Sequence, residues 1–237
     1  MDYTFPVIGI MHCCYMTKFG VPRQPRLIRE AAGYIELQEP YNQPNCVRGL
    51  EDFSHIWVLF VFHQNIREKW KATVRPPRLG GDKRIGVFAS RSSFRPSPIG
   101  MSVMELAGIE QKDHGVLRIH VKGMDVVDGT PIIDIKPYIP YSDSIADAKG
   151  GYADTVPDEC SLDVSVSLQA EKSFKELEKR GVLGLKDLSL RVIGADPRPA
   201  YQREEGRVYE VLLSGYEIIW KIVNSVAVIT DVRRVPK

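Results

Sequence analysis

Apolar residues up to about position 140 occur in short runs that are too brief for amphipathic helices. The runs are rich in Val, Ile, Phe and Trp, and Gly, Pro, Asn or Asp residues separate them. Short apolar runs separated by turn-forming residues are typical of β-strands joined by turns. An Asp-Gly step within the last run suits the tight turn of a hairpin. The pattern predicts strands at residues 5–10, 33–37, 55–62, 84–89, 101–109 and 116–121 and a hairpin over residues 126–133.

An antiparallel sheet of this many strands best avoids exposed edges by closing on itself. We therefore predict a mainly β protein whose N-terminal part is a closed antiparallel β-barrel. A doubly wound dinucleotide-binding fold is disfavoured, because the strands do not alternate with long helices and no G-x-G-x-x-G follows a strand.

The composition changes at residues 141–160, which are acidic, small and Gly-containing, as expected of a linker. We place a domain boundary there, with a barrel domain at residues 1–155 and a small α+β domain at residues 156–237. In the second domain, Phe174 and Leu177 recur among Lys and Glu with helical spacing. The expected elements are a helix at residues 170–180 and strands at 162–168, 207–213, 216–222 and 226–232.

The composition is that of an ordinary globular protein of 237 residues, with 43% hydrophobic residues, 26% charged residues and a net charge of +2. No run approaches the ~20 apolar residues of a membrane-spanning helix, and the start lacks the pattern of a secretory signal. We therefore expect a cytoplasmic protein without a membrane association. The four cysteines form no C-x-x-C pair, so we expect free thiols and no metal site.

Basic residues concentrate in one long connection at residues 66–84, where seven Lys or Arg stand against two acidic residues. Loops longer than about 12 to 15 residues are uncommon in compact domains unless they are functional or disordered. A basic loop that carries Trp70 fits a phosphate backbone and a stacked base. A solvated surface loop explains this segment equally well.

The stretch RSSFRPSPIG, residues 91–100, is a stiff cationic turn between two predicted strands. Pro96 and Pro98 restrict the backbone, so the side chains around them are held in place. Arg91 offers a planar fork for a carboxylate or phosphate, and the serines suit a polar small molecule. Alternatively, Arg91 and Arg95 pair with acidic residues of a neighbouring strand. The segment VPRQP, residues 21–25, likewise places an Arg and an amide side chain between two prolines. Alternatively, it is an ordinary loop.

Other polar side chains stand at the ends of predicted strands. His63 and Gln64 follow the most apolar strand, although a lone His there is more often structural. Asp134 and Lys136 share a face because strand side chains alternate, and Tyr138 follows on that face. They form either a simple ion pair or a base with a charged neighbour, and a shifted pKa would require burial.

Five segments taken together resemble the TrmO family, the tRNA adenine-N6 methyltransferases also called YaeB or TsaA-like. The resemblance spans nearly the whole chain in order and departs from the family pattern at Cys13-Cys14 and at Ser97, where Asn is frequent. The segments are VPRQP, CVRGLEDFSHIWVLFVFHQN, VRPPRLGGDKRIGVFASRSSFRPSPIGMSVMEL, DVVDGTPIIDIKPYIP and ADPRPAYQ.

The resemblance implies a homodimeric enzyme that binds S-adenosyl-L-methionine on a β-barrel. The implied reaction transfers its methyl group to N6 of N6-threonylcarbamoyladenosine at position 37, beside the anticodon, in tRNA for threonine. The residues that match the family's cofactor-binding motifs are Pro22, Arg23, Gln24, His63, Gln64, Arg91, Met101, Asp128, Gly129, Thr130 and Pro131.

The resemblance also suggests where proton transfer and RNA binding occur. Loss of the N6 proton would be helped by a base, and we assign Asp134, Lys136 and Tyr138 to that role by their proximity to the cofactor-binding turn. The tRNA anticodon arm would meet the basic loop and the ADPRPAYQ segment. The predicted RNA contacts are Arg75, Arg78, Arg95, Arg198 and Arg203.

Two alternatives belong to other functional classes. A non-catalytic RNA-binding module with a SAM-like pocket would bind tRNA without methyl transfer. An enzyme that acts on a small anionic substrate held by Arg91 and Arg95 would not need the basic loop. The full set of family motifs argues against both.

Overall fold

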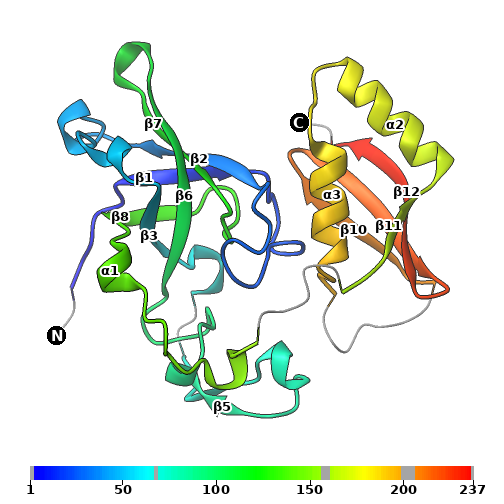
Figure 1. Cartoon of the computed structure of the whole chain (residues 1–237), viewed down its shortest axis with the longest axis horizontal. Helices are drawn as coiled ribbons and strands as arrows, with labels where there is room; N and C mark the ends of the chain where they lie inside the picture. Colours follow the sequence, from blue (N-terminus) through cyan, green and yellow to red (C-terminus); the bar gives the residue numbers. More distant parts are fainter. Residues whose placement is uncertain (1–2, 67–68, 156–160, 199–205, 236–237) are drawn as a thin grey trace.

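The N-terminal part of the molecule is a closed six-stranded barrel, as predicted (Figure 1). The computed structural model describes residues 3–66, 69–155, 161–198 and 206–235. The strands follow the order β1-β2-β7-β6-β3-β8 around the barrel, and each neighbouring pair is antiparallel. Their bounds are β1 Gly9–Cys13, β2 Ala32–Leu37, β3 His55–Val61, β6 Ile99–Gln111, β7 Leu117–Lys122 and β8 Pro131–Pro137.

The barrel interior is filled by alternate residues of its strands. In β3, the side chains of Ile56, Val58 and Phe60 are at most 3% exposed, whereas the residues between them are only partly buried. Met11 and Met104 contribute fully buried side chains from β1 and β6. Burying side chains of this size stabilises the fold by about 1.5–3 kcal/mol each, so the period-two pattern also drives closure.

Two of the predicted strands were wrong in position or role. The first strand is Gly9–Cys13 rather than residues 5–10. Residues 84–89 form only β5 (Ile85–Gly86), which pairs with β4 (Thr73–Val74) outside the barrel, followed by a 3-10 turn at Val87–Ala89. Short apolar runs carry no information about which strand they will pair with, so the sequence did not separate these segments from the barrel strands.

The predicted hairpin over residues 126–133 was also wrong, because its first arm is a loop. The backbone N–H groups of Asp128 and Gly129 donate to the carbonyl oxygens of Tyr15 and Met11, both at 2.8 Å. The turn is therefore fixed to the β1 segment. Its second arm becomes β8, which pairs with β3 and β1.

The C-terminal part is a small α+β unit, as predicted, built on a four-stranded sheet of order β10-β11-β12-β9. The structure has a helix that we did not predict, α3, in which Leu185, Leu188 and Val192 are buried. The helical spacing of these three apolar residues in the sequence could have predicted it. The bounds are α1 Pro140–Asp143, β9 Val164–Val166, α2 Leu168–Lys179, α3 Leu185–Gly194, β10 Val208–Leu213, β11 Tyr216–Val223 and β12 Val226–Arg234.

The hairpin between β10 and β11 packs directly against the barrel. Tyr15 and Leu213 form an isolated antiparallel bridge, and the Ser214 N–H donates to the Cys14 carbonyl oxygen at 2.8 Å. Gly20 lies against Val211, and a Cβ added to Gly20 would come within 2.4 Å of a Val211 methyl group. The domain boundary at residues 155 and 156 stays a prediction, since residues 156–160 lie outside the described ranges.

Among the described residues, no helix is long and apolar enough to cross a membrane. Cys13, Cys14 and Cys46 are free thiols, as predicted, while Cys160 lies outside the described ranges. In the same ranges, no three His, Cys, Asp or Glu side chains are grouped as metal ligands would be.

Candidate functional site at one end of the barrel

The strand register brings two of the predicted motifs to the same end of the barrel. Val61 pairs with Ile99, and the Phe62 N–H donates to the Pro98 carbonyl oxygen at 2.8 Å. The residues that follow β3 therefore lie beside the stiff turn that precedes β6. His63 is half-buried and Gln64 is exposed in the short 3-10 turn at this point.

Lys18 and Asn65, which we did not single out from the sequence, connect these segments to the N-terminal loop. The Lys18 Nζ donates to the Gln64 carbonyl oxygen at 2.8 Å and to the Asn65 Oδ1 at 2.5 Å. The Asn65 Nδ2 in turn donates to the Ser93 Oγ at 2.7 Å. Because they connect segments far apart in the chain, no local pattern could have identified them.

A hydrogen bond joins the two arginine-containing motifs. The Arg91 Nη1 donates to the Gln24 Oε1 at 2.8 Å, so VPRQP and RSSFRPSPIG meet in space. The Arg95 Nη1 donates to the Ser90 carbonyl oxygen at 3.1 Å and so holds its own turn together. Neither arginine forms an ion pair within the described part of the chain, contrary to the simpler interpretation of this motif.

Asp125, in the loop between β7 and β8, is the neighbour of this pair that sequence reasoning missed. The Ser102 Oγ donates to the Asp125 Oδ1 at 2.5 Å. Burial raises the pKa of the Asp125 carboxyl to about 6, against the opposing effects of Ser102 and the Arg91 charge. In the sequence, the position of this acidic residue between two apolar residues, Met124 and Val126, was the signal that could have identified it.

The Asp128 side chain holds the turn Asp128–Pro131 against β1, and the Thr130 side chain stabilises the turn itself. The Cys13 N–H donates to the Asp128 Oδ1 at 2.9 Å, and the Thr130 Oγ1 donates to the Val127 carbonyl oxygen at 2.7 Å. Thr130 is buried, whereas Asp128 is partly exposed and lines an open cavity of about 520 Å³ with His12. This cavity is also lined by Cys13, Cys14, Ala32, Gly33, Tyr34, His120 and Ser214.

The remaining predicted cofactor-binding residues are placed differently. Pro22 is buried and Arg23 is exposed. The Met101 side chain is 52% exposed, because β6 alternates and the buried Ser102 takes the inward position. A contact by Met101 would therefore use the outer surface of the barrel or the backbone.

Asp134, Lys136 and Tyr138 lie on the outer face of the barrel wall. A register shift between Leu59 and Phe60 turns residues 134 and 136 outward, opposite Leu59 and Trp57. The Lys136 Nζ lies 2.6 Å from the Asp134 Oδ2, and both side chains are well exposed. Asp134 and Lys136 therefore form the simple ion pair that was one of the two interpretations of this segment. The catalytic role of Asp134, Lys136 and Tyr138 stays a prediction.

The basic loop retains its charge in the structure. None of the ion pairs among the described residues involves the described residues of this loop, and Arg75 is exposed. Arg78 donates to the Thr155 Oγ1 at 2.8 Å and to the Thr155 carbonyl oxygen, which ties the loop to the segment after α1. Trp70 is 56% exposed.

The predicted RNA contacts in the C-terminal part are less accessible. Arg198 is 8% exposed, and its Nε and Nη2 donate to the two carboxyl oxygens of Asp196 at 2.7 and 3.0 Å. Arg203 lies outside the described residues. A contact between Arg198 and RNA stays a prediction that would require this ion pair to open.

Two family profiles match the chain in succession. One describes the tRNA-methyltransferase O N-terminal domain and covers residues 10–144, and the other describes the TrmO C-terminal domain and covers residues 159–235. The crystal structure of TrmO from Pseudomonas aeruginosa superposes with a TM-score of 0.80 at 36% identity, covering 98% of each chain.

Two relatives with assigned names cover the chain to a similar extent. An Escherichia coli K12 protein named tRNA (adenine(37)-N6)-methyltransferase is 46% identical over 230 residues, which are 94% of this chain and 95% of the relative. A Pseudomonas aeruginosa protein named as a candidate S-adenosylmethionine-dependent methyltransferase is 43% identical over 221 residues, covering 93% of both chains.

Proposed function

This chain belongs to the tRNA-methyltransferase O family, and we propose that it methylates N6 of adenine 37 in tRNA with S-adenosyl-L-methionine as the donor. We further propose that the adenine carries the threonylcarbamoyl group and belongs to tRNA for threonine. The main support for this proposal is that Gln24, Arg91 and Asp125 lie together at one end of the barrel. The chain also matches the family along nearly its whole length.

The chemistry of the groups at this end of the barrel fits the cofactor. S-adenosyl-L-methionine has a carboxylate, which suits the Arg91 fork, and an ammonium and ribose hydroxyls, which suit the carboxylate of Asp128. When bound, the cofactor supplies an electrophilic methyl group on a sulfonium centre. The proposed contacts are Pro22, Arg23, Gln24, His63, Gln64, Arg91, Met101, Asp128, Gly129, Thr130 and Pro131.

The protein's main contribution to a methyl transfer is alignment, because the nitrogen must approach in line. The hydrogen bonds from Lys18 to residues 64 and 65 and from Arg91 to Gln24 fix the loops around the site. Such fixed contacts reduce the reorganisation needed when the substrate binds.

The proton on N6 needs an acceptor, and two groups are candidates. Asp134, with Lys136 and Tyr138, is the candidate from the sequence. Asp125 is favoured by its environment, because a carboxylate with a pKa of about 6 is ionised at neutral pH and more basic than an ordinary Asp. Asp125→Asn and Asp134→Asn should separate them, since removal of the acceptor lowers kcat and abolishes the acidic limb of its pH profile.

The proposed tRNA contacts are Arg75, Arg78 and Arg95 with the anticodon arm, and Arg198 and Arg203 further along the chain. We also propose a cytoplasmic homodimer. A second copy would cover apolar side chains that are exposed around the site, because patches of this kind usually mark an interface. They are Ile66, Trp70, Phe88, Phe94, Ile99 and Met101.

The direct test is transfer of label from S-adenosyl-L-methionine to threonine tRNA, with and without its threonylcarbamoyl group. We expect incorporation only into the modified tRNA and its loss in Arg91→Ala. Arg48→Ala is the matched control, because the Arg48 side chain bonds Asn45 within its own loop. tRNA binding without any incorporation would replace this proposal with a non-catalytic RNA-binding module.

A further inference from the structure

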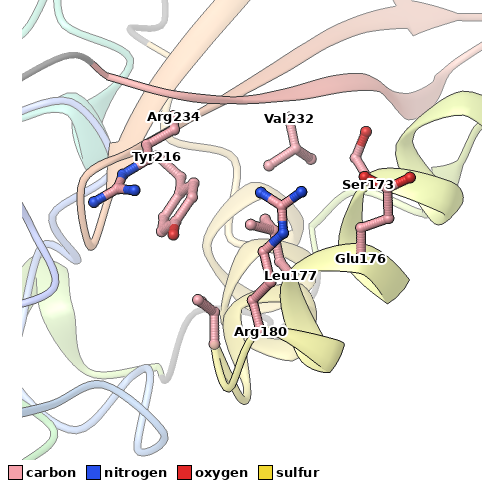
Figure 2. A pocket seen from close by; sticks show the side chains of 8 residues that line it. Ser173, Glu176, Leu177, Arg180, Tyr216, Val232 and Arg234 are labelled. Atoms are coloured by element: carbon pink, nitrogen blue, oxygen red, sulfur yellow. The ribbon is translucent and has the colours of Figure 1, made fainter.

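A second cavity, of about 410 Å³, lies in the C-terminal part between α2 and the ends of β11 and β12 (Figure 2). One side is a stripe of α2 in which Ser173, Glu176 and Leu177 recur at helical spacing, ending in the C-cap Arg180. The other side is formed by Tyr216, Val232 and Arg234, and Val182 completes the lining.

The register of the sheet places Tyr216 beside Arg234. These residues are directly paired across β11 and β12, so their side chains leave the same face of the sheet. Val232 shares that face, whereas Arg233 points to the opposite one. Figure 2 shows Arg180 reaching from α2 toward Val232, whereas the Arg234 guanidinium lies beyond the Tyr216 ring, on the side away from Arg180.

The two arginines have no acidic partner within the described ranges. No ion pair there involves Arg180 or Arg234, although the neighbouring Arg233 is paired with Asp231 at 2.8 Å. The Tyr216 ring is half-buried, and none of the hydrogen bonds of the described residues uses its hydroxyl. Two guanidinium groups without an acidic partner in the described part of the chain, one on each side of an aromatic ring, form a cationic surface with an apolar floor.

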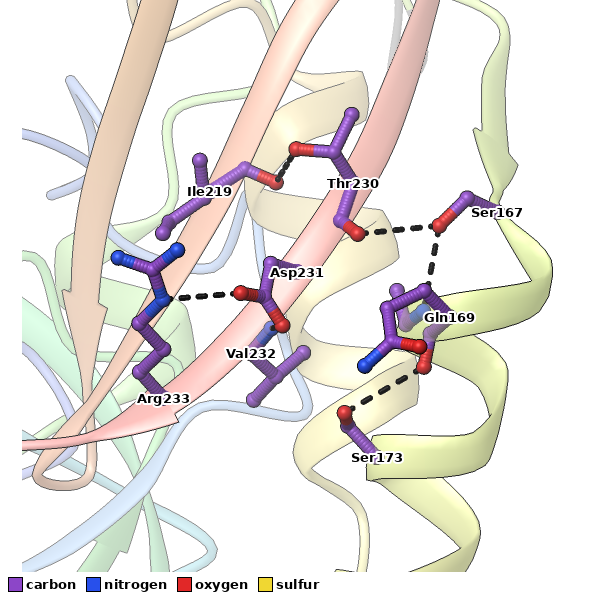
Figure 3. Close-up of polar contacts among 9 residues, drawn as sticks. Ser167, Gln169, Ser173, Ile219, Thr230, Asp231, Val232 and Arg233 are labelled. Carbon is purple, nitrogen blue, oxygen red and sulfur yellow. Dashed lines mark hydrogen bonds and ion pairs between the residues drawn. The ribbon is translucent and has the colours of Figure 1, made fainter.

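A polar network holds the walls of this cavity (Figure 3). The Ser167 Oγ caps α2 by accepting from the Ala170 N–H at 3.2 Å and donates to the Thr230 carbonyl oxygen at 3.1 Å. The Thr230 Oγ1 donates to the Ile219 carbonyl oxygen at 3.2 Å. Ser167 therefore binds the start of α2 to β12 without using a side chain that lines the cavity, which favours a preformed site.

The chemistry of the lining matches a nucleotide. Guanidinium groups bind phosphate through paired hydrogen bonds, and aromatic rings stack on unpaired bases. Glu176 and Ser173 can accept hydrogen bonds from ribose hydroxyls or from a base amino group. A carboxylate beside the two arginines disfavours a ligand that is only anionic, such as free phosphate.

We propose that this cavity binds one nucleotide of an RNA chain, with its base against Tyr216 and the phosphates before and after it on Arg180 and Arg234, one on each side of the ring. The inference rests on the proposed function, in that the RNA is the tRNA substrate. The hairpin that begins β11 connects the two cavities, because Ser214 lines the one that holds Asp128 and Tyr216 lines this one. A tRNA contact here would supplement the contact at the barrel.

The test compares tRNA binding by wild type, Arg180→Ala/Arg234→Ala and Tyr216→Ser over a salt series, by fluorescence anisotropy. We expect the double variant to bind roughly tenfold more weakly or worse. Its plot of log K against log salt should be flatter by about two, one for each arginine that no longer neutralises a phosphate. In methyl transfer, KM for tRNA should rise while KM for the cofactor and kcat stay unchanged.

Arg233→Ala is the matched control, since it removes the adjacent charge from the opposite face and should leave the salt slope unchanged. Tyr216→Phe keeps the ring and should bind tRNA as wild type does. Wild-type affinity and slope in the double variant would overturn the inference. So would adenosine monophosphate binding that the double variant abolishes without any effect on tRNA, which would assign the cavity to a free nucleotide. Failure of wild type to methylate tRNA would instead contradict the proposed function.

Discussion

At the scale of single residues, burial sets the protonation of the groups near the site. The thiols of Cys13 and Cys14 have their pKa raised to about 12, chiefly by burial, so they are protonated and poorly nucleophilic at neutral pH. The same effect on Asp125 produces a carboxyl that titrates at about 6. The pKa shifts of the thiols and of this carboxyl depend on burial, which the sequence alone does not show.

Asp125→Asn tests the environment of this carboxyl through stability. A folded-state pKa of about 6, above the ordinary 3.8, favours the protonated form in the fold. The stability that Asp125 contributes is therefore present at low pH and is lost as the pH rises to 6. As the pH rises from about 4 to 6, the variant should become more stable relative to wild type, and the difference should stay constant above pH 6. Thermal melts without cofactor measure this, and parallel pH curves for the two proteins would contradict the raised pKa.

At the scale of elements, close backbone approach decides where glycine is required. Gly33 in β2 lies beside the end of β1, where a Cβ would come within 2.4 Å of the His12 carbonyl oxygen and 2.9 Å of the Cys13 Cβ. Both of those neighbours also line the cavity that holds Asp128. The spacing between β1 and β2 is therefore tied to the shape of that cavity.

Gly33→Ala should destabilise the barrel by about 1–3 kcal/mol, because the backbone must shift to admit the methyl group. Urea unfolding followed by circular dichroism measures the change. Gly86→Ala is the control, since Gly86 has no atom within 4 Å of the new Cβ position. Equal unfolding midpoints for the two variants would show that β1 and β2 can separate without cost.

At the scale of the whole molecule, charge is distributed unevenly. The chain carries only +2, yet the loop at residues 66–84 has a surplus of five positive charges, and within its described residues no ion pair neutralises them. The hydrogen bonds of Arg78 to Thr155 hold this loop near the segment that leads out of the barrel part. A local surplus of this kind attracts a polyanion without raising the net charge of the protein.

Arg75→Glu/Arg78→Glu should weaken tRNA binding and flatten its salt dependence, because attraction to the phosphates is replaced by repulsion. Affinity for S-adenosyl-L-methionine, measured by calorimetry, should be unchanged. Arg48→Glu is the control for each single variant, Arg75→Glu or Arg78→Glu, because it makes the same change in charge away from the loop. If tRNA affinity survives in the loop variant, the loop is not part of the interface.

The sequence by itself determined the classes of element and the chemistry of the motifs. Period-two apolar runs specify strands with one buried face, and Arg91, Gln24 and Asp128 stand in stiff or turn-forming segments whatever the fold. Only the tertiary structure decided which runs close the barrel, that residues 84–89 lie outside it, and that Asp134 faces outward. Those outcomes depend on pairing register and on a one-residue shift, and neither leaves a local signature. The raised pKa of Asp125 has the same origin, since burial is made by distant parts of the chain meeting in space.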